Sequence, residues 1–314
     1  MSGPTVAVTV GDRQLQLSNL DKVLYPEVGF TKAEVIDYYA RIAPTMLTHC
    51  SHRCVTFRRF PNGVDGNSFF EKRCPSHRPA WVPTAPGPGD RNGEIGYCVL
   101  DEPAALVWAA NLAALELHTP MARHRDLEAP QMVVFDLDPG PGTDIGTCCQ
   151  IALELRELTD GVGLELFAKT SGSKGLQVYL PLNSDLDPAG GAPHAHEECS
   201  NFALAAAQVL ERRSPRRVTT TMAKSQRTGR VFVDWSQNSR HKTTVCAYSL
   251  RARPTPTVST PVTWDEVSAA ADGAPLSFNA GEVLARVETH GDLFAATATL
   301  VQRLPRPRGT QPES

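Results

Sequence analysis

The sequence predicts an α+β fold, because strand-like and helix-like segments are interspersed along the whole chain. Short apolar runs such as MVVFDLD, which begins at Met132, are followed by Pro and Gly and are typical of strands. Longer stretches repeat apolar residues at helical spacing behind a capping residue, as after Thr31. With 314 residues, the chain is long enough to bury a sizeable core. We expect one domain over residues 1–304 and a disordered, Pro-rich tail over residues 305–314.

The composition is that of an ordinary globular protein, with 41% hydrophobic and 21% charged residues. No apolar run approaches the roughly 20 residues needed to span a bilayer. The N-terminal residues lack the basic and apolar regions of a signal peptide. We therefore expect a cytoplasmic protein with no membrane partner. In that compartment its eight cysteines should be reduced thiols and not disulfides.

The N-terminal segments predict a hairpin and then a helix. Thr5–Val10 and Gln14–Leu17 alternate as strands around a Gly-Asp turn. A capping box formed by Thr31 and Glu34 starts a helix that runs to about Leu47.

Val55–Phe60 is the next predicted strand, and Phe69 and Phe70 follow it among several cations. Adjacent aromatic rings flanked by Lys and Arg can stack on bases while the charges hold a nucleic-acid backbone. The alternative is that both rings are core residues. Because neighbouring residues of a strand face opposite ways, we expect one of the two rings to lie in the core.

Many Pro and Gly residues predict a loop over Pro79–Gly93. A strand over Glu94–Leu100 follows, and then a helix over Ala104–Leu117 with His118 at its C-terminal end. A histidine at that place could be a cap favoured by the helix dipole, or a ligand for a phosphate group.

The apolar strand from Met132 ends in two acids, Asp136 and Asp138. Residues i and i+2 of a strand face the same side, so the two carboxylates converge and would repel each other without a cation. An SGSKG turn at residues 171–175 lies between two further apolar runs. Its small residues let the backbone approach a phosphate, and Lys174 supplies charge. A metal site beside a phosphate site indicates phosphoryl or nucleotidyl transfer.

The rest of the chain continues the mixed pattern, and it contains a third acid at the end of an apolar strand, Asp234. We interpret Asp234 as a further metal ligand; the alternative is that it only compensates the positive charge around it. His194 and His196 lie in a flexible Pro- and Gly-containing loop, which argues against a metal site there. The predicted strands are Leu164–Lys169, Leu176–Leu182, Arg230–Trp235 and Thr243–Ser249. The predicted helices are Ile145–Leu158, Glu197–Arg212, Thr263–Ala271, Ala280–Val287 and Leu293–Leu304.

Positive charge is concentrated between Arg212 and Arg253. This window holds eleven Lys or Arg and one acid, a local charge of +10 in a chain whose net charge is -3. A one-sided basic surface is typical of proteins that bind a phosphate backbone. The alternative is a solvated basic face without a partner. A separate group of His and Cys residues between His49 and His77 lacks the repeated spacing of zinc modules, so we predict no zinc site.

Several sequence blocks resemble the signature blocks of the polymerase domain of bacterial ligase D, which belongs to the archaeo-eukaryotic primase-polymerase group. The blocks are VFDLDPG, TSGSKGLQVYLPL, VFVDW-x-QN and YSLRARP-x-x-x-VSTPVTW. The resemblance extends from LSNLDKVLYP at Leu17 to the helices after Trp264. It implies a primase-polymerase fold, with central mixed or antiparallel sheets flanked by helices. Because no ligase or nuclease segment follows, we expect a stand-alone, mycobacterial-type paralogue of that domain.

The resemblance also implies roles for individual residues. The metal-binding catalytic positions, which would hold two Mn²⁺ or Mg²⁺ ions, are Asp136, Asp138 and Asp234. The positions that match nucleotide-binding residues are Ser171, Lys174, Gln177, His118, Arg251, Arg58 and Gln237. The positions that match DNA-binding residues are Phe69 and Phe70, against the template, and Lys22 and Lys32, at a downstream 5′-phosphate.

The implied activity is DNA-dependent nucleotidyl transfer, in which rNTPs or dNTPs are added to a DNA primer during gap filling or double-strand break end joining. Implied partners are primer-template or gapped DNA with a 5′-phosphate, nucleotides, and end-joining factors such as Ku and a ligase, and the implied location is the nucleoid. One position departs from the family pattern. The family motif S-G-x-K-G-x-H ends here in Gln177, which can donate a hydrogen bond but cannot carry positive charge or transfer a proton.

Two other functions share part of this pattern. A haloacid-dehalogenase-type phosphatase also places D-x-D at a strand end, but it usually has Thr or Val where this chain has Gly140, and it has no need of the basic window. A non-catalytic protein that bridges DNA ends, with a vestigial metal site, is supported only by Gln177.

Overall fold

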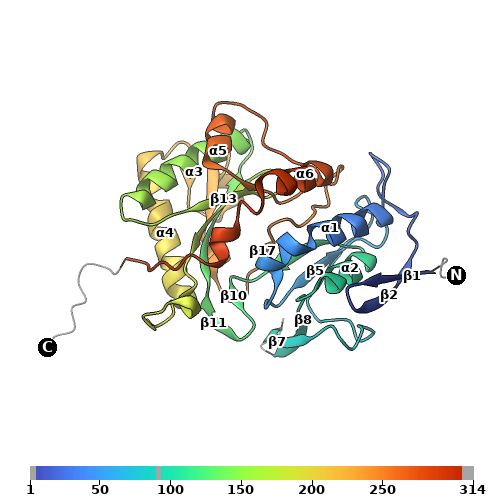
Figure 1. The fold of residues 1–314 in the computed structure, drawn as a ribbon. Coiled ribbons are helices and arrows are strands. Elements are labelled where there is room, and N and C mark those ends of the chain that lie inside the picture. Colours follow the sequence, from blue (N-terminus) through green and yellow to red (C-terminus); the bar gives the residue numbers. More distant parts are fainter. Residues whose placement is uncertain (1–4, 90–92, 306–314) are drawn as a thin grey trace.

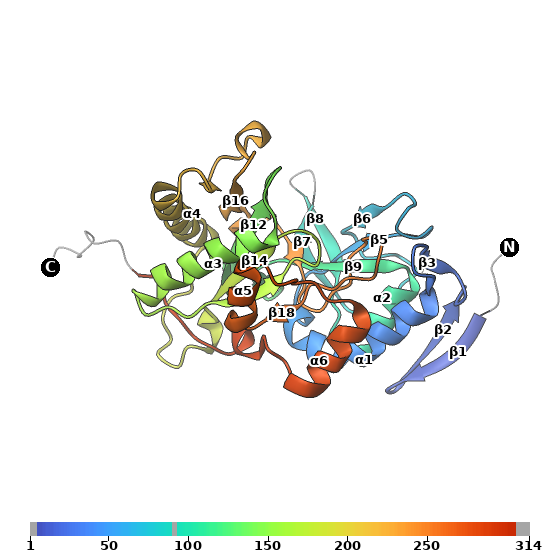
Figure 2. The ribbon, with the colours of Figure 1, turned by 90° about the horizontal axis from the view of Figure 1, so that it is seen from above.

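The computed structural model describes residues 5–89 and 93–305, which form two large sheets with helices packed on them and four two-stranded sheets (Figures 1 and 2). A six-stranded mixed sheet and a four-stranded antiparallel sheet lie in neighbouring halves of the molecule, each with its own hydrophobic core. The predicted α+β architecture of mixed and antiparallel sheets flanked by helices is therefore confirmed. The predicted tail falls almost entirely on residues 306–314, outside the described residues. In the described ranges no helix is long and apolar enough to cross a membrane.

The half that contains the four-stranded sheet is built mainly from the first third of the chain. Its strand order is β17 (Thr244–Val245), β9 (Ala114–Thr119), β5 (Thr56–Arg59) and β6 (Phe69–Glu71). Two helices that contact each other, α1 (Lys32–Cys50) and α2 (Pro103–Asn111), pack in the same core. Two smaller pairs precede α1, namely β1 (Thr5–Val10) with β2 (Arg13–Ser18) and β3 (Val23–Tyr25) with β4 (Phe30–Thr31). The capping box predicted at Thr31 and Glu34 starts α1.

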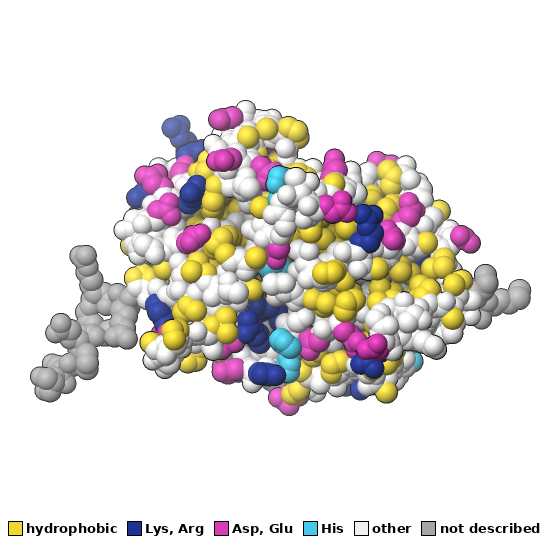
Figure 3. Space-filling view, in the orientation of Figure 1, with side chains coloured by type: hydrophobic (Ala, Val, Ile, Leu, Met, Phe, Trp, Pro, Cys, Tyr) yellow, Lys and Arg dark blue, Asp and Glu magenta, His cyan; other side chains and the backbone are white. Residues whose placement is uncertain are grey.

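The other half contains the six-stranded sheet and the helices α3 (Ile145–Asp160), α4 (His196–Arg213) and α5 (Trp264–Ala271). Its strand order is β15 (Val218–Thr219), β16 (Val231–Asp234), β12 (Met132–Pro139), β14 (Leu176–Pro181), β13 (Phe167–Thr170) and β18 (Pro261–Val262). Only the β15–β16 pair is parallel. Helix α6 (Ala280–His290) returns to contact α1, and a hairpin of β10 (Ala122–Arg123) and β11 (Asp126–Pro130) lies between the halves (Figure 1). On the face seen in Figure 3, acidic and basic side chains are interspersed.

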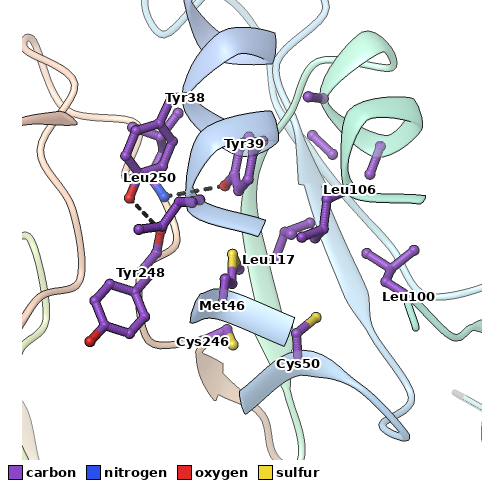
Figure 4. Close-up of a cluster of buried hydrophobic side chains, with 14 of the residues drawn as sticks. Tyr38, Tyr39, Met46, Cys50, Leu100, Leu106, Leu117, Cys246, Tyr248 and Leu250 are labelled. Atoms are coloured by element: carbon purple, nitrogen blue, oxygen red, sulfur yellow. Dashed lines mark hydrogen bonds between the residues drawn. The ribbon is translucent and has the colours of Figure 1, made fainter. Parts of the chain in front are cut away.

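Buried tyrosines of α1 fix the segment after β17 (Figure 4). The Tyr38 hydroxyl donates to the Tyr248 carbonyl at 2.7 Å, and the Tyr39 hydroxyl accepts from the Leu250 backbone N at 3.2 Å. Tyr248 has a positive φ of 68°, which ends the strand predicted over Thr243–Ser249 after only two residues. The neighbouring Arg251 is thereby held at a defined place between the halves.

The predicted helix over Ala104–Leu117 is wrong in its second half. Helix α2 ends at Asn111, Ala113 takes a positive φ of 57°, and the next residues form strand β9 between β17 and β5. Ala and Leu favour helices, but pairing on both edges within a buried sheet overrides that weak local preference. His118 is therefore a strand residue and not a helix cap.

Two other predicted segments differ from the structure. Pro79–Gly93, predicted as a loop, contains strand β7 (Thr84–Pro88), which pairs with β8 (Glu94–Cys98) in a two-stranded sheet. Proline is tolerated there because each strand of such a sheet has a free edge. The helix predicted over Leu293–Leu304 is only a short 3₁₀ turn, η4 (Ala295–Ala298). The Asn183 side chain donates hydrogen bonds to backbone carbonyls that would be paired within a longer helix.

The prediction that all eight cysteines are thiols is also wrong. Cys74, after β6, forms a disulfide with Cys98 at the end of β8, while the other six cysteines are free and buried. The backbone N of Cys74 also donates to the Gly96 carbonyl at 2.8 Å. The bond therefore ties the β7–β8 hairpin to the segment that follows Phe69 and Phe70.

Candidate active site

The three predicted acids meet on two neighbouring strands. Asp136 on β12 lies directly opposite Asp234 on β16, and Asp138 lies two residues further along β12, on the same side. Burial and the charge of Asp138 raise the pKa of Asp136 to about 7, and burial and the charge of Asp234 raise the pKa of Asp138. The fold thus gathers three carboxylates that repel one another, an arrangement that a divalent cation would stabilise.

The donor set is of the right kind for Mn²⁺ or Mg²⁺, which take carboxylate oxygens as ligands. The side chains do not stand in a finished metal site: within residues 5–89 and 93–305, no group of three or more His, Cys, Asp or Glu could hold an ion as placed. Asp234 is engaged with its own turn. Its Oδ1 accepts from the backbone N and Oγ of Ser236, at 3.0 and 2.6 Å, and its Oδ2 accepts from Gln237 Nε2 at 2.9 Å. To bind a metal, Asp234 must exchange some of these hydrogen bonds.

Hydrogen bonds hold the short 3₁₀ turn that follows β16, η3 (Trp235–Asn238), against β12, the strand that carries Asp136 and Asp138. Asn238 is buried, and its side chain both donates to the Val134 carbonyl and accepts from the Val134 backbone N, at 2.8 Å in each case. These bonds hold the turn, and with it Asp234 and Gln237, against β12. The structure therefore brings Gln237 to the carboxylates, where its visible contact is with Asp234.

The SGSKG turn closes on itself beside β12. The Ser171 backbone N donates to the Gly175 carbonyl at 2.9 Å, and Ser171 Oγ accepts from the backbone N of Ser173 and Gly175. Only glycine fits at Gly172, whose φ is 67° and whose Cβ would lie 2.6 Å from Arg251 Cγ.

The turn also borders a hollow at the end of the carboxylate strand. A Cβ on Gly175 would lie 2.3 Å from the Leu137 carbonyl, which shows how closely the turn approaches β12. Lys174 is exposed and lines a hollow of about 690 Å³ together with the turn that begins at Gly140. A phosphate-sized group has room there.

A buried acid that the sequence did not single out, Glu116, organises three of the predicted nucleotide-binding residues. Its carboxylate lies 3.0 Å from His118 Nε2, 3.3 Å from Arg251 Nε and 3.5 Å from Arg58 Nη1. It also accepts from the Ala252 backbone N at 3.1 Å. Burial alone would raise the pKa of Glu116, but the hydrogen bond with His118 and the charge of Arg251 lower it to about 2. Burial lowers the pKa of His118.

The alternation of residues along a strand could have predicted that Glu116 lies beside His118. Glu116 and His118 are residues i and i+2 of β9 and share a face, as Asp136 and Asp138 do on β12. In a helix, residues i and i+2 do not share a face. Because this segment was predicted as a helix, the pairing of Glu116 with His118 was not predicted.

Phe69 and Phe70 are both exposed, by 45% and 58%, so the prediction that one of them is a core residue is wrong. They do face opposite ways, but β6 is a three-residue edge strand with solvent on both faces. Each ring is capped by its cross-strand partner on β5: the guanidinium of Arg59 lies 5.4 Å from the Phe69 ring, and that of Arg58 lies 5.4 Å from the Phe70 ring. Both rings are thus partly open to solvent beside cations, and the Phe70 ring also lies 5.5 Å from the His118 ring.

Gln177 is 4% exposed and lies beneath the carboxylates. It is opposite Asp136 in the β12–β14 register, so both side chains lie on the same side of the sheet, and Gln177 lowers the pKa of the Asp136 carboxyl against the stronger effect of burial. Its Oε1 accepts from the buried Lys169, whose pKa burial lowers to about 7, and from the Tyr179 hydroxyl. The visible contacts of Gln177 are therefore with other side chains of the site.

Lys22 and Lys32 lie near each other at the start of α1. Lys22 Nζ donates to Asn62 Oδ1 at 3.1 Å and is exposed, whereas Lys32 Nζ is mostly buried and donates to the Ser18 carbonyl at 2.6 Å. Burial and the charge of Lys22 lower the pKa of Lys32 to about 8. Two amines this close form a small site suited to an anion.

The basic window is less uniform than its charge of +10 suggests. Acids from outside the window pair with Arg217, Arg240 and Arg251. The guanidinium of Arg227 stacks on Phe232 at 3.8 Å, and its charge lowers the pKa of Asp138 against the stronger effect of burial. The interspersed charges on the face in Figure 3 likewise show no single basic surface there.

Comparisons of the sequence and of the structure with known proteins identify the same family. A family model described as the primase-polymerase domain of LigD matches residues 31–294. The multifunctional non-homologous end joining protein LigD of Mycolicibacterium smegmatis is 43% identical over 284 residues, which cover 90% of this chain and 36% of that protein. The bifunctional LigD of Bacillus subtilis is 30% identical over 281 residues, which cover 90% of this chain and 44% of that protein. The chain thus spans less than half the length of these relatives.

A solved structure agrees with the sequence comparison. The polymerase domain from Mycobacterium tuberculosis ligase D in complex with DNA superposes with a TM-score of 0.83 at 40% sequence identity. The match covers 92% of this chain and 99% of that one. The similarity therefore extends over both halves of the fold.

Proposed function

Since the chain belongs to the family of LigD primase-polymerase domains, we propose that it is a DNA-dependent nucleotidyltransferase that adds rNTPs or dNTPs to a DNA primer. The observation that carries the proposal is the convergence of Asp136, Asp138 and Asp234 on two paired strands. Two-metal nucleotidyl transfer needs such a carboxylate set beside a phosphate-binding site. The turn at residues 171–175 lies against the carboxylate strand at the required place.

When bound, two Mn²⁺ or Mg²⁺ ions supply activation of the primer 3′-hydroxyl and stabilise the pyrophosphate leaving group. The three Asp carboxylates would hold them. Lys174 and Arg251 would neutralise charge on the triphosphate, and His118 and Ser171 would hydrogen-bond to its oxygens. Arg58, held by Glu116 and stacked on Phe70, is suited to contact the nucleotide base.

The DNA would bind across the exposed aromatic rings and the lysine pair. The related M. tuberculosis domain was solved in complex with DNA, which supports the same ligand here. Because the relatives are named for non-homologous end joining, we propose that the substrate is gapped or broken DNA, that the chain acts at the nucleoid, and that its partners include Ku and a ligase. Family membership removes the phosphatase alternative, and nucleotide addition would remove the end-bridging one.

Primer extension tests the proposal directly. Gapped DNA, with and without a downstream 5′-phosphate, is incubated with Mn²⁺ or Mg²⁺ and with rNTPs or dNTPs. We expect nucleotides complementary to the template to be added in the presence of metal and none in a chelator. Failure to extend any primer with either metal would refute the proposed function.

Replacing both Phe69 and Phe70 with alanine is expected to reduce templated addition roughly 10- to 100-fold, because stacking on an aromatic ring is worth about 1–3 kcal/mol per base. Both rings are exposed, so the thermal midpoint of unfolding should change little. Extension rates and melting curves measure the two effects. Val162→Ala, another exposed apolar residue, is the control; equal rates for the double variant and this control would contradict the stacking role.

Replacing Lys22 and Lys32 should abolish the preference for DNA whose downstream strand carries a 5′-phosphate. We expect the wild type to bind gapped DNA about ten-fold tighter when the downstream strand carries the phosphate, since hydrogen bonds to charged groups contribute about 1.5–3 kcal/mol. Lys22→Ala with Lys32→Ala should bind both DNAs equally, as measured by fluorescence anisotropy. Lys224→Ala, from the basic window, should instead weaken both equally. A phosphate preference that survives in the double variant would exclude this role.

A further inference from the structure

Lys169 is a buried amine whose hydrogen-bonding capacity is fully used. It is 1% exposed, and its Nζ donates to Gln177 Oε1 at 2.5 Å, to Ser259 Oγ at 2.7 Å and to the Val245 carbonyl at 3.1 Å. Ser259 Oγ gives its own proton to the Thr170 carbonyl at 2.9 Å, so it must accept from the lysine. An ammonium group has three N–H donors and no acceptor. With three acceptors in place, Lys169 has no donor left for a ligand.

These contacts determine which way the Gln177 amide points. Gln177 Oε1 accepts from both Lys169 and the Tyr179 hydroxyl, the latter at 3.2 Å. Both lone pairs of that oxygen are then occupied. The same side chain faces Asp136, its directly opposite neighbour on β12, and lowers the pKa of that carboxyl. Since Oε1 is occupied and a carboxylate only accepts, Nε2 is the group that Gln177 presents to Asp136.

The reversed amide is strongly disfavoured. It would place the Gln177 N–H groups against the Lys169 cation and the Gln177 oxygen against the Asp136 carboxylate, which replaces two attractive contacts with two repulsive ones. Buried polar groups that lose their partners are costly, and Gln177 is only 4% exposed, so water could not replace the lost partners. One orientation is therefore selected by a residue that does not touch Asp136 itself.

We infer that Lys169 is a positioning residue which, by orienting Gln177, holds the Asp136 carboxylate for a divalent cation. The inference rests on the proposed function, because the cation is part of that proposal. It gives Gln177 a role that differs from binding the nucleotide: the glutamine is the link between a buried amine and a metal ligand. Hydrogen-bond partners behind a metal ligand typically affect metal affinity 10–100-fold.

Mn²⁺ affinity of the full chain without nucleotide or DNA tests the inference, measured by titration calorimetry and by electron paramagnetic resonance of free Mn²⁺. We expect Lys169→Met and Gln177→Met each to weaken Mn²⁺ binding about ten-fold. Because both act through one contact, the double variant should bind no more weakly than the weaker single variant. Tyr179→Phe removes the other donor to Gln177 Oε1 and should weaken binding about two- to five-fold, which keeps the test valid if Lys169→Met does not fold.

Arg53→Met is the matched control. Arg53 is a second buried cation, and its Nη1 donates to backbone carbonyls of Pro120, Met121 and Ala122. Its loss should lower the thermal midpoint without changing Mn²⁺ affinity. Wild-type affinity in both Lys169→Met and Tyr179→Phe, or effects of Lys169→Met and Gln177→Met that multiply in the double variant, would overturn the inference.

The two proposals fail separately. If the wild type extends primers while Lys169→Met and Tyr179→Phe both bind Mn²⁺ normally, the inference is wrong and the proposed function stands. If the wild type binds Mn²⁺ with the expected dependence on Lys169 but extends no primer, the function is wrong and the positioning role stands. A wild type that binds no Mn²⁺ contradicts the inference as well.

Discussion

Replacing Asp138 with alanine is expected to abolish nucleotide addition while DNA binding is retained. Asp138 shares one side of the sheet with Asp136 and Asp234, and its side chain is the least buried of the three. We expect a fall in the single-turnover rate of at least about a thousand-fold, which corresponds to about 4 kcal/mol of transition-state stabilisation. The aromatic rings and lysines proposed to bind DNA lie on other elements, so the dissociation constant for gapped DNA should change less than about three-fold.

The stability of this variant separates loss of function from loss of fold. Because the three carboxylates repel one another, removing one should leave the thermal midpoint in metal-free buffer unchanged or higher. Adding Mn²⁺ should raise the midpoint of the wild type and not that of the variant. Asp160→Ala removes an exposed acid at the end of α3, in a surface ion pair with Arg156, and should affect neither rate nor metal response. Primer extension by Asp138→Ala at the wild-type rate would refute the metal site.

The features predicted from the sequence were those set by local chemistry. The strand rule that places Asp136 and Asp138 on one side holds, and so does the capping box at Thr31. The small residues of the SGSKG turn are needed because the turn approaches both Arg251 and β12. What the sequence could not supply is the register of β12 against β16 and β14, which brings Asp234 and Gln177 opposite Asp136. Register depends on the packing of whole strands, and no local pattern encodes it.

The errors have separate physical causes. The expected compartment argued for free thiols, and interpreting Pro79–Gly93 as a loop also hid the β7–β8 hairpin that brings Cys98 to Cys74. The rule that adjacent strand residues face opposite ways held at Phe69 and Phe70, but the inference that one must be buried failed, because an edge strand has solvent on both faces.

The largest predicted effect on the fold and the nucleotide site together comes from Glu116. Its carboxylate is 1% exposed and is shared by Arg58, His118 and Arg251. Glu116→Gln would leave the two guanidinium groups without a counter-charge. Removing one partner of a buried ion pair lowers the unfolding free energy by about 3–5 kcal/mol. We expect the unfolding free energy at pH 7 to fall by about 3 kcal/mol and the KM for the nucleotide to rise at least about ten-fold, measured by denaturant titration and by primer extension.

The pH dependence of the difference in unfolding free energy between wild type and Glu116→Gln shows whether the charge of Glu116 causes it. The folded-state pKa of Glu116, about 2, lies below its unfolded value, so its stabilising effect is fully present above about pH 5 and is lost as the pH falls toward 2. The gap in unfolding free energy between wild type and Glu116→Gln should therefore narrow across that range. Glu102→Gln removes a surface ion pair with Arg13 and should cost less than about 1 kcal/mol. A gap for Glu116→Gln that stays constant from pH 7 to pH 3 would show that shape, and not charge, holds the three cationic side chains together. In that case the low pKa of Glu116 would not be what organises this part of the site.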